Sequence, residues 1–153
     1  MDASALKQIE LFDGLTHRHL EALASITEDR TYEAGARLFA EGDAGDELFM
    51  VLKGKVRISK IVEGVGEEAL AILEPGAYFG EMALVSDLPR SAHATCNTPV
   101  EVGVIRREAF EQLLFLDKDL AYELLWTFVR TLSRRLAETN DKIKAFFAMS
   151  SRF

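Results

Sequence analysis

The chain has 153 residues, 48% of them hydrophobic, so it can build a substantial core, and we expect residues 1–153 to form a single domain. Its 25 acidic and 18 basic residues give a formal net charge of −7, which disfavours general attraction to nucleic acid or to an acidic membrane surface. The only cysteine, Cys96, excludes an intrachain disulfide, and no segment has the apolar run of a membrane span or a secretory signal, so we expect a cytoplasmic protein with a bystander thiol.

Residues 1–30 are predicted to form short helices, because their apolar positions recur at helical spacing. Gly14 separates two pieces, and Thr16 is the expected N-cap of the second piece. The apolar positions that show this spacing are Leu6, Ile9, Leu11, Phe12, Leu20, Leu23, Ala24 and Ile26.

Residues 31–106 change to a period of two, which is typical of β-strands. Glycine or proline separates the apolar runs, and 53–55 and 63–66 are predicted hairpin tips. We therefore expect a mainly β fold with flanking helices: an antiparallel β-barrel of jelly-roll type with about eight strands. The alternating positions are Leu48 to Leu52, Val56, Ile58, Leu70, Ile72, Val100, Val102 and Val104.

Residues 107–150 are predicted to be helical: a short helix over 109–115, and a long one that Asp117 or Asp119 can cap and that runs to about residue 147. Along the long helix, residues at alternating steps of three and four define an apolar seam of the coiled-coil kind. The members of this apolar seam are Tyr122, Leu125, Val129, Leu132, Leu136, Thr139, Ile143 and Phe146. The seam could pack lengthwise on its own barrel, or it could pair with the same helix of a second subunit. We favour a homodimer, because the seam is longer than a small barrel can cover.

Residues 79–92, from Phe79 to Ala92, carry the clearest signal of a site. Gly80 permits a backbone conformation that other residues resist, and the turn that follows it offers backbone N–H groups to an anion. Glu81 can accept a hydrogen bond from a sugar hydroxyl, while Arg90 presents a planar fork of donors that matches phosphate oxygens. A simpler alternative is that Glu81 and Arg90 form an ion pair that closes a surface loop. These residues alone leave both interpretations open.

The run Phe79-Gly80-Glu81-Met82-Ala83-Leu84, followed by Pro89-Arg90-Ser91-Ala92, resembles the phosphate-binding cassette of the cyclic-nucleotide-binding domain family. That family includes regulatory subunits of cyclic-AMP-dependent protein kinase and the bacterial catabolite activator protein. Residues 34–48 and 52–57 are similar to the turn segments of the same family. The resemblance implies a regulatory sensor rather than an enzyme. It would bind cyclic AMP, with cyclic GMP as the second candidate, and would signal through its C-terminal helix to an unknown downstream protein.

The resemblance also implies roles for single residues. Glu81 would accept a hydrogen bond from the ribose 2′-hydroxyl beside the Gly80 backbone, and Arg90 would pair with the exocyclic phosphate oxygens. Leu70 and Leu73 would line the sugar and base side. The groups that complete the phosphate cradle are the backbone N–H groups around Met82, Ala83, Ser91 and Ala92, together with the Ser91 hydroxyl.

The long helix resembles the dimer helix of the catabolite activator protein, from which polar residues reach the purine in both subunits. Thr139 and Asn140 fall on the matching positions. The alternative is that Thr139 only sets the register of a helix pair. The activator continues into a helix-turn-helix domain and this chain stops at Phe153, so direct DNA recognition is not expected.

Two other functions compete with ligand sensing. A degenerate member of the family could act as a dimerisation or interaction module without ligand, although its cassette would be expected to lack Glu81 or Arg90. A metal-dependent enzyme on a similar barrel would need a cluster of histidine and carboxylate ligands. The chain has only His17, His19 and His93, so we expect neither metal nor cofactor. His93 follows the cassette; it could lie near the base or the dimer interface and titrate near neutral pH, or be an ordinary strand residue.

Overall fold

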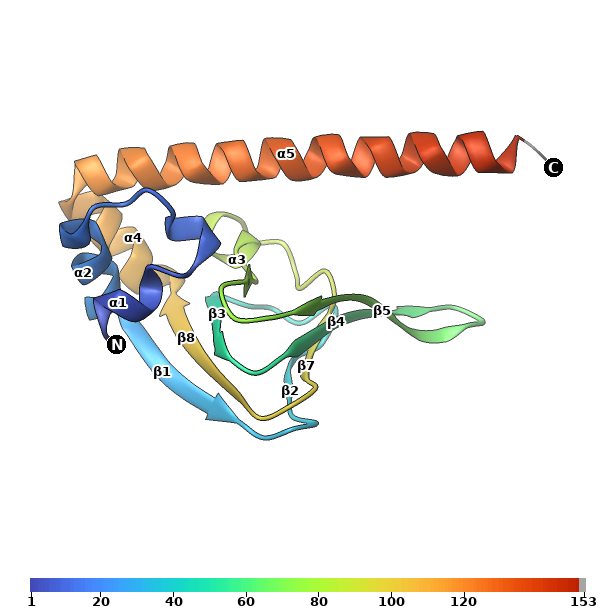
Figure 1. Cartoon of the computed structure of the whole chain (residues 1–153), viewed down its shortest axis with the longest axis horizontal. Coiled ribbons are helices and arrows are strands. Elements are labelled where there is room, and N and C mark those ends of the chain that lie inside the picture. The colour runs from blue at the N-terminus through green and yellow to red at the C-terminus, as the bar shows by residue number, and fades with distance from the viewer. Residues whose placement is uncertain (152–153) are drawn as a thin grey trace.

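The computed structural model, which describes residues 1–151, has its strands in two four-stranded sheets, most of its short helices at one end and one long helix across the top (Figure 1). The helices are α1 (Ala3–Leu6), the 3-10 helix η1 (Glu10–Phe12), α2 (His17–Ser25), α3 (Met82–Val85), α4 (Arg107–Leu116) and α5 (Lys118–Ser150). The strands are β1 (Thr27–Tyr32), β2 (Arg37–Phe39), β3 (Glu47–Lys53), β4 (Val56–Val62), β5 (Gly66–Leu73), β6 (Tyr78–Phe79), β7 (His93–Cys96) and β8 (Val100–Arg106).

The sheets have the orders β1-β8-β3-β6 and β2-β7-β4-β5, and all their pairings are antiparallel. The predicted jelly-roll fold, with helices before and after the β region in the sequence, is confirmed. Its strands pair as two separate sheets. Both predicted hairpin tips are also confirmed, since 54–55 join β3 to β4 and 63–65 join β4 to β5.

Strand β3 is apolar on both of its faces, because each face packs against a different part of the core. Leu48 and Met50 point into a core shared with the helices, whereas Phe49 and Val51 point into the core between the sheets. All four are at most 2% exposed. Burying a side chain of this size contributes about 1.5–3 kcal/mol, so a strand that is apolar on both faces belongs in the centre of the fold.

The predicted helical zone 1–30 is too long, because α2 ends at Ser25 and β1 begins at Thr27. The Thr16 side chain caps α2 by accepting from the His19 N–H, as predicted. Thr27 then donates its hydroxyl to the Leu23 carbonyl at 2.7 Å, and its chain turns to pair with β8. The six residues of β1 have no apolar alternation, so only their partner strand identifies them as a strand.

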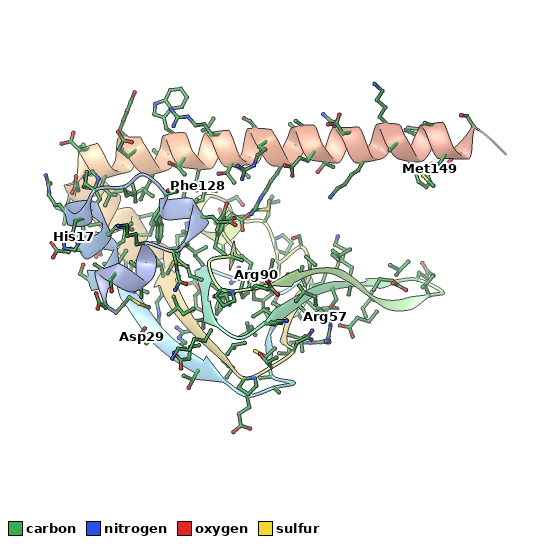
Figure 2. The ribbon with its side chains drawn as sticks, viewed as in Figure 1. His17, Asp29, Arg57, Arg90, Phe128 and Met149 are labelled. Carbon is green, nitrogen blue, oxygen red and sulfur yellow. The ribbon has the colours of Figure 1, made fainter. Side chains whose placement is uncertain are left out.

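Helix α5 is 33 residues long and begins at Lys118, directly after its N-cap Asp117, whose side chain accepts a hydrogen bond from the Leu120 N–H. Only its first turns are buried, through Leu120, Leu124 and Phe128. Figure 2 shows Phe128 pointing from α5 towards the body of the domain. No helix in the part of the chain that the structure describes is long and apolar enough to cross a membrane.

The apolar seam lies on another face of α5, and its apolar members are between 42% and 67% exposed. The interpretation that the seam packs lengthwise on its own barrel is therefore wrong. The helix packs on the domain instead through Leu120, Leu124 and Phe128, which are spaced four residues apart. In the described part of the chain, the apolar seam is exposed to solvent.

Candidate ligand-binding site

A cavity of about 230 Å³ opens where the cassette meets the sheet β2-β7-β4-β5 and helix α5. The predicted residues that line it are Leu73, Phe79, Gly80, Glu81, Met82, Ala83, Arg90, Ser91 and Ala92. Thus residues 79–92, which are close in sequence, do converge on one space with a wall from β5.

Gly80 sits at the turn from β6 into the single-turn helix α3, with a φ of +76°. A Cβ at this position would lie 2.6 Å from Arg90 Nη1 and 3.0 Å from the Glu47 carbonyl oxygen. Two features favour glycine at position 80: the backbone has a left-handed conformation, and the Arg90 guanidinium passes close to it. The Ala83 N–H donates to the Gly80 carbonyl at 3.1 Å, which holds the turn closed.

Arg90 is the central feature of the cavity, and Figure 2 places it in the middle of the molecule. The residue is only 8% exposed, and its guanidinium donates to the carbonyl oxygens of Glu47 at 3.0 Å and Gly80 at 3.4 Å. It also lies over the Phe39 ring, 4.2 Å from the centroid. Its Nε atom is buried without a hydrogen-bond partner.

Among residues 1–151, no carboxylate lies within ion-pair distance of Arg90. Burial lowers the pKa of Arg90, yet an arginine keeps its charge at neutral pH. The negative charges of Glu47, Asp46, Asp43 and Glu81 oppose this lowering, but none of these carboxylates pairs directly with the guanidinium among the described residues. An anion that enters the cavity would therefore stabilise the buried charge further.

The loop 41–47 packs against Arg90 and fixes its backbone. The Gly42 N–H donates to the Arg90 carbonyl, and the Arg90 N–H donates to the Asp43 carbonyl, each at 2.8 Å. A Cβ at Gly45 would overlap the Arg90 Nε atom. The loop therefore forms a close-fitting wall against the guanidinium of Arg90, a residue that also lines the cavity.

Glu81 is paired with Arg135 of α5 and not with Arg90. The predicted alternative of a Glu81–Arg90 ion pair is therefore wrong. The Glu81 side chain is only 12% exposed, and the Arg135 guanidinium lies 5.1 Å from the centroid of the Tyr78 ring. This arrangement leaves the negative charge of Glu81 satisfied while Arg90 remains free to meet an anion.

The structure does not bring three predicted residues into the cavity. Leu70 is 59% exposed on β5 and is absent from the lining, whereas Leu73 of the same strand is part of it. Thr139 and Asn140 lie on the exposed half of α5, where the Thr139 hydroxyl donates to the Arg135 carbonyl at 2.8 Å.

Sequence reasoning missed several lining residues. Arg135 lies one helical turn before Thr139, so the helix spacing could have identified it. Phe39 and Ile58 come from strands β2 and β4, and no local pattern links them to the cassette. The lining residues not predicted are Phe39, Ile58, Tyr78, Leu88, Pro89 and Arg135.

No three histidine, cysteine, aspartate or glutamate side chains of the described chain come together where they could hold a metal ion. Cys96 lies in the core between the sheets, 2% exposed, and burial raises the pKa of its thiol. This placement fits a bystander thiol.

Comparison with known proteins agrees with the architecture. Residues 29–117 match the family described as cyclic nucleotide-binding domain. A cAMP-dependent protein kinase regulatory subunit of Eremothecium gossypii is 37% identical over 109 residues, which are 71% of this chain and 23% of that protein. A cGMP-dependent protein kinase of Caenorhabditis briggsae is 32% identical over 111 residues, 71% of this chain and 15% of that protein.

Among solved structures, the catabolite activator protein of Thermus thermophilus superposes with a TM-score of 0.80 at 32% identity, covering 89% of this chain and 62% of that one. The chain thus spans less than two thirds of the length of each of these three relatives. The matched family is a binding domain rather than a catalytic one.

Proposed function

This chain belongs to the cyclic nucleotide-binding domain family, and from that premise we propose that it is a regulatory module that binds cyclic AMP in the cavity around Arg90. The observation that carries the proposal is the buried Arg90 guanidinium, which has no carboxylate partner among residues 1–151. A cyclic phosphate carries one negative charge and two exocyclic oxygens, which suit the planar donor fork of arginine.

The other cassette residues have complementary tasks in this proposal. Glu81 accepts a hydrogen bond from the ribose 2′-hydroxyl, while Ser91 and the backbone around Met82 and Ala92 surround the phosphate. The Ala83 N–H already donates to Gly80, so it contributes by holding the turn. Apolar atoms line the rest of the cavity, where the sugar and base lie against Phe79, Ile58 and Leu73.

Helix α5 transmits binding to a downstream protein. Arg135 joins α5 to Glu81, so a nucleotide that engages Glu81 changes what this helix contacts. A ligand shifts a conformational equilibrium only by binding one arrangement better than the other, and the Glu81–Arg135 pair supplies that difference.

We include a homodimer in the proposal because the apolar seam of α5 is open to solvent. Pairing two seams places Thr139 and Asn140 at a junction between subunits, from which they reach the purine. The relatives are named for cAMP and for cGMP, so they do not decide between the two ligands. Our choice of cyclic AMP rests on Ser91 beside Arg90, because members of the family that prefer cyclic GMP often carry a threonine at that position.

Isothermal titration calorimetry with cyclic AMP and cyclic GMP tests the proposal. We expect one cyclic AMP per chain with a Kd of about 1 μM or tighter, and weaker binding of cyclic GMP. Tighter binding of cyclic GMP would show that our choice of ligand is wrong, while the proposed binding site would stand. If neither nucleotide binds at about 1 mM, the chain is a ligand-free interaction module and the proposal is wrong.

A further inference from the structure

We propose that His93 is a positioning residue for Arg90, and that protonation of its imidazole ring weakens anion binding in the cavity. This inference rests on the proposed function, because it concerns the affinity of the same cavity.

His93 is the first residue of β7 and directly follows Ala92 of the cassette. Its Nδ1 atom accepts a hydrogen bond from the Glu41 backbone N–H at 2.9 Å, across 52 positions of sequence. The side chain is 7% exposed, and its Nε2 atom is buried without a partner. The bond requires a free lone pair on Nδ1, so the neutral ring carries its proton on Nε2.

Glu41 is the first residue of the loop that encloses Arg90. The next residue, Gly42, donates its N–H to the Arg90 carbonyl, and Asp43 accepts from the Arg90 N–H. Further along, a Cβ at Gly45 would overlap the guanidinium, and the Glu47 carbonyl accepts a hydrogen bond from it. The His93 bond therefore anchors one end of the loop that positions the cation.

Protonation removes this anchor. An imidazolium has a proton on both ring nitrogens and cannot accept, so the Glu41 N–H would face another N–H. A buried donor that loses its acceptor destabilises the arrangement that holds it. We expect the loop 41–47 to loosen, and the Arg90 guanidinium to lose its fixed orientation towards the cavity.

A charged group near His93 offers its protonated ring an alternative partner. Glu67 of β5 is close enough for electrostatic attraction to His93, and it accepts from the Ser59 hydroxyl at 2.6 Å. Ser59 of β4 lies opposite His93 in the ladder. A protonated His93 would thus lose its hydrogen bond from the Glu41 N–H and be attracted to the Glu67 carboxylate instead.

Three cations share that surface. Arg37 of β2 and Arg57 of β4 lie 3.8 Å and 3.7 Å from the Glu67 carboxylate. Lys60 of β4 lies 3.6 Å from the Glu41 carboxylate. The hydrogen bond from Ser59, with Arg57 and Arg37 nearby, lowers the pKa of Glu67. Histidine is the only side-chain type at this cluster that ordinarily titrates between about pH 5 and 8.

The remaining histidines provide a control. His17 and His19 lie on α2, and Figure 2 shows His17 at the far left of the domain, away from Arg90. His17 is paired with Glu21 on the same helix. A pH effect on affinity that comes from His93 should therefore survive substitution of His17.

The experiment measures the Kd for cyclic AMP at about pH 7.0 and about pH 5.5 in four proteins: the parent, His93→Asn, His93→Leu and His17→Asn. Loss of one hydrogen bond predicts that the parent binds about threefold to tenfold more weakly at the lower pH. Asparagine keeps an acceptor at every pH. At both pH values, His93→Asn should therefore bind with the Kd that the parent shows at pH 7.0. Leucine has no acceptor, so His93→Leu should bind weakly at both, and His17→Asn should behave like the parent.

A second measurement needs neither variant nor ligand. In the parent protein without nucleotide, the hydrogen-exchange protection of the Glu41 amide should fall as the His93 ring titrates, with both followed by NMR. Unchanged protection, or a His93→Asn variant that keeps the pH dependence of the parent, overturns the inference. Binding at pH 7.0 without any pH dependence overturns it as well and leaves the proposed function intact, whereas no binding at pH 7.0 contradicts the proposed function itself.

Discussion

Arg135 of α5 pairs with Glu81 at the start of α3, across 54 positions of sequence. The pair connects the long helix to the cassette at the mouth of the cavity. Since Arg135 also lies over the Tyr78 ring, it touches two residues of the cavity wall at once. A change at the cavity therefore reaches α5 through one side chain.

Replacing Arg135 tests this connection. We expect Arg135→Ala to weaken cyclic AMP binding several-fold and to increase hydrogen exchange in the half of α5 that follows Phe128, because no other ion pair links that half to the cassette among residues 1–151. The free energy of unfolding should fall by about 1 kcal/mol or less, since the pair is partly solvated. Arg134→Ala is the control, because Arg134 is 66% exposed and pairs only along the helix with Glu138. An equal effect of both substitutions would contradict the role of Arg135.

Replacing Arg90 separates ligand binding from folding. Arg90→Met keeps an unbranched apolar stem, is shorter than arginine, and removes a buried charge that has no direct carboxylate partner among the described residues. We expect nucleotide affinity to fall at least about 100-fold, because the phosphate charge is then left unpaired in the cavity. Thermal melting of the ligand-free protein should change little or rise. A large fall in melting temperature, with affinity retained, would show that Arg90 is structural.

Gly45 tests how closely the loop 41–47 must fit the guanidinium. The backbone at Gly45 does not have a positive φ, so an alanine there adds only a steric conflict with Arg90 Nε. We expect Gly45→Ala to weaken nucleotide binding by about tenfold or more while the fold persists. Gly64→Ala at the β4–β5 tip is the control, since it meets open space and carries only backbone strain. Calorimetry on both variants gives the comparison, and equal affinities would refute the close fit.

The apolar seam predicts a dimer that a single charge disrupts. Leu132 is 42% exposed and contributes to no buried cluster of its own domain among the residues described. We expect Leu132→Asp to leave the melting of a single subunit unchanged and to convert the dimer to a monomer in analytical ultracentrifugation. Ala137→Asp places the same charge off the seam and should remain dimeric. A parent protein that stays monomeric at about 100 μM, with and without cyclic AMP, would contradict the dimer.

Cys96 should be unreactive in the folded protein. Burial raises the pKa of its thiol, so the thiolate is scarce at pH 8, and the surrounding core excludes reagents. We expect iodoacetamide to label it only after denaturant unfolds the chain. Because the folded-state pKa is raised, the stability that this group contributes is present below the ordinary thiol pKa and is lost as the pH rises through the folded value. Rapid labelling of the native protein would contradict the burial.

Local sequence determined a large part of this protein. The caps at Thr16 and Asp117, the hairpin tips and the residues of the cassette all depend on neighbours within a few positions. Strand β1 shows where such patterns fail. Its charged sequence has no alternation, and it is a strand because β8 provides hydrogen-bond partners.

Only the tertiary structure decided which partners the cassette residues have. The sequence places Glu81 and Arg90 nine positions apart and leaves open whether they pair with each other or bind a ligand. In the structure, Glu81 pairs with Arg135, and Arg90 has no carboxylate partner among the described residues. The reason is the docking of α5 through Leu120, Leu124 and Phe128, which brings Arg135 to the cavity and leaves the apolar seam facing solvent. Short-range spacing identifies the candidate cassette, but long-range packing determines which partners its arginine has.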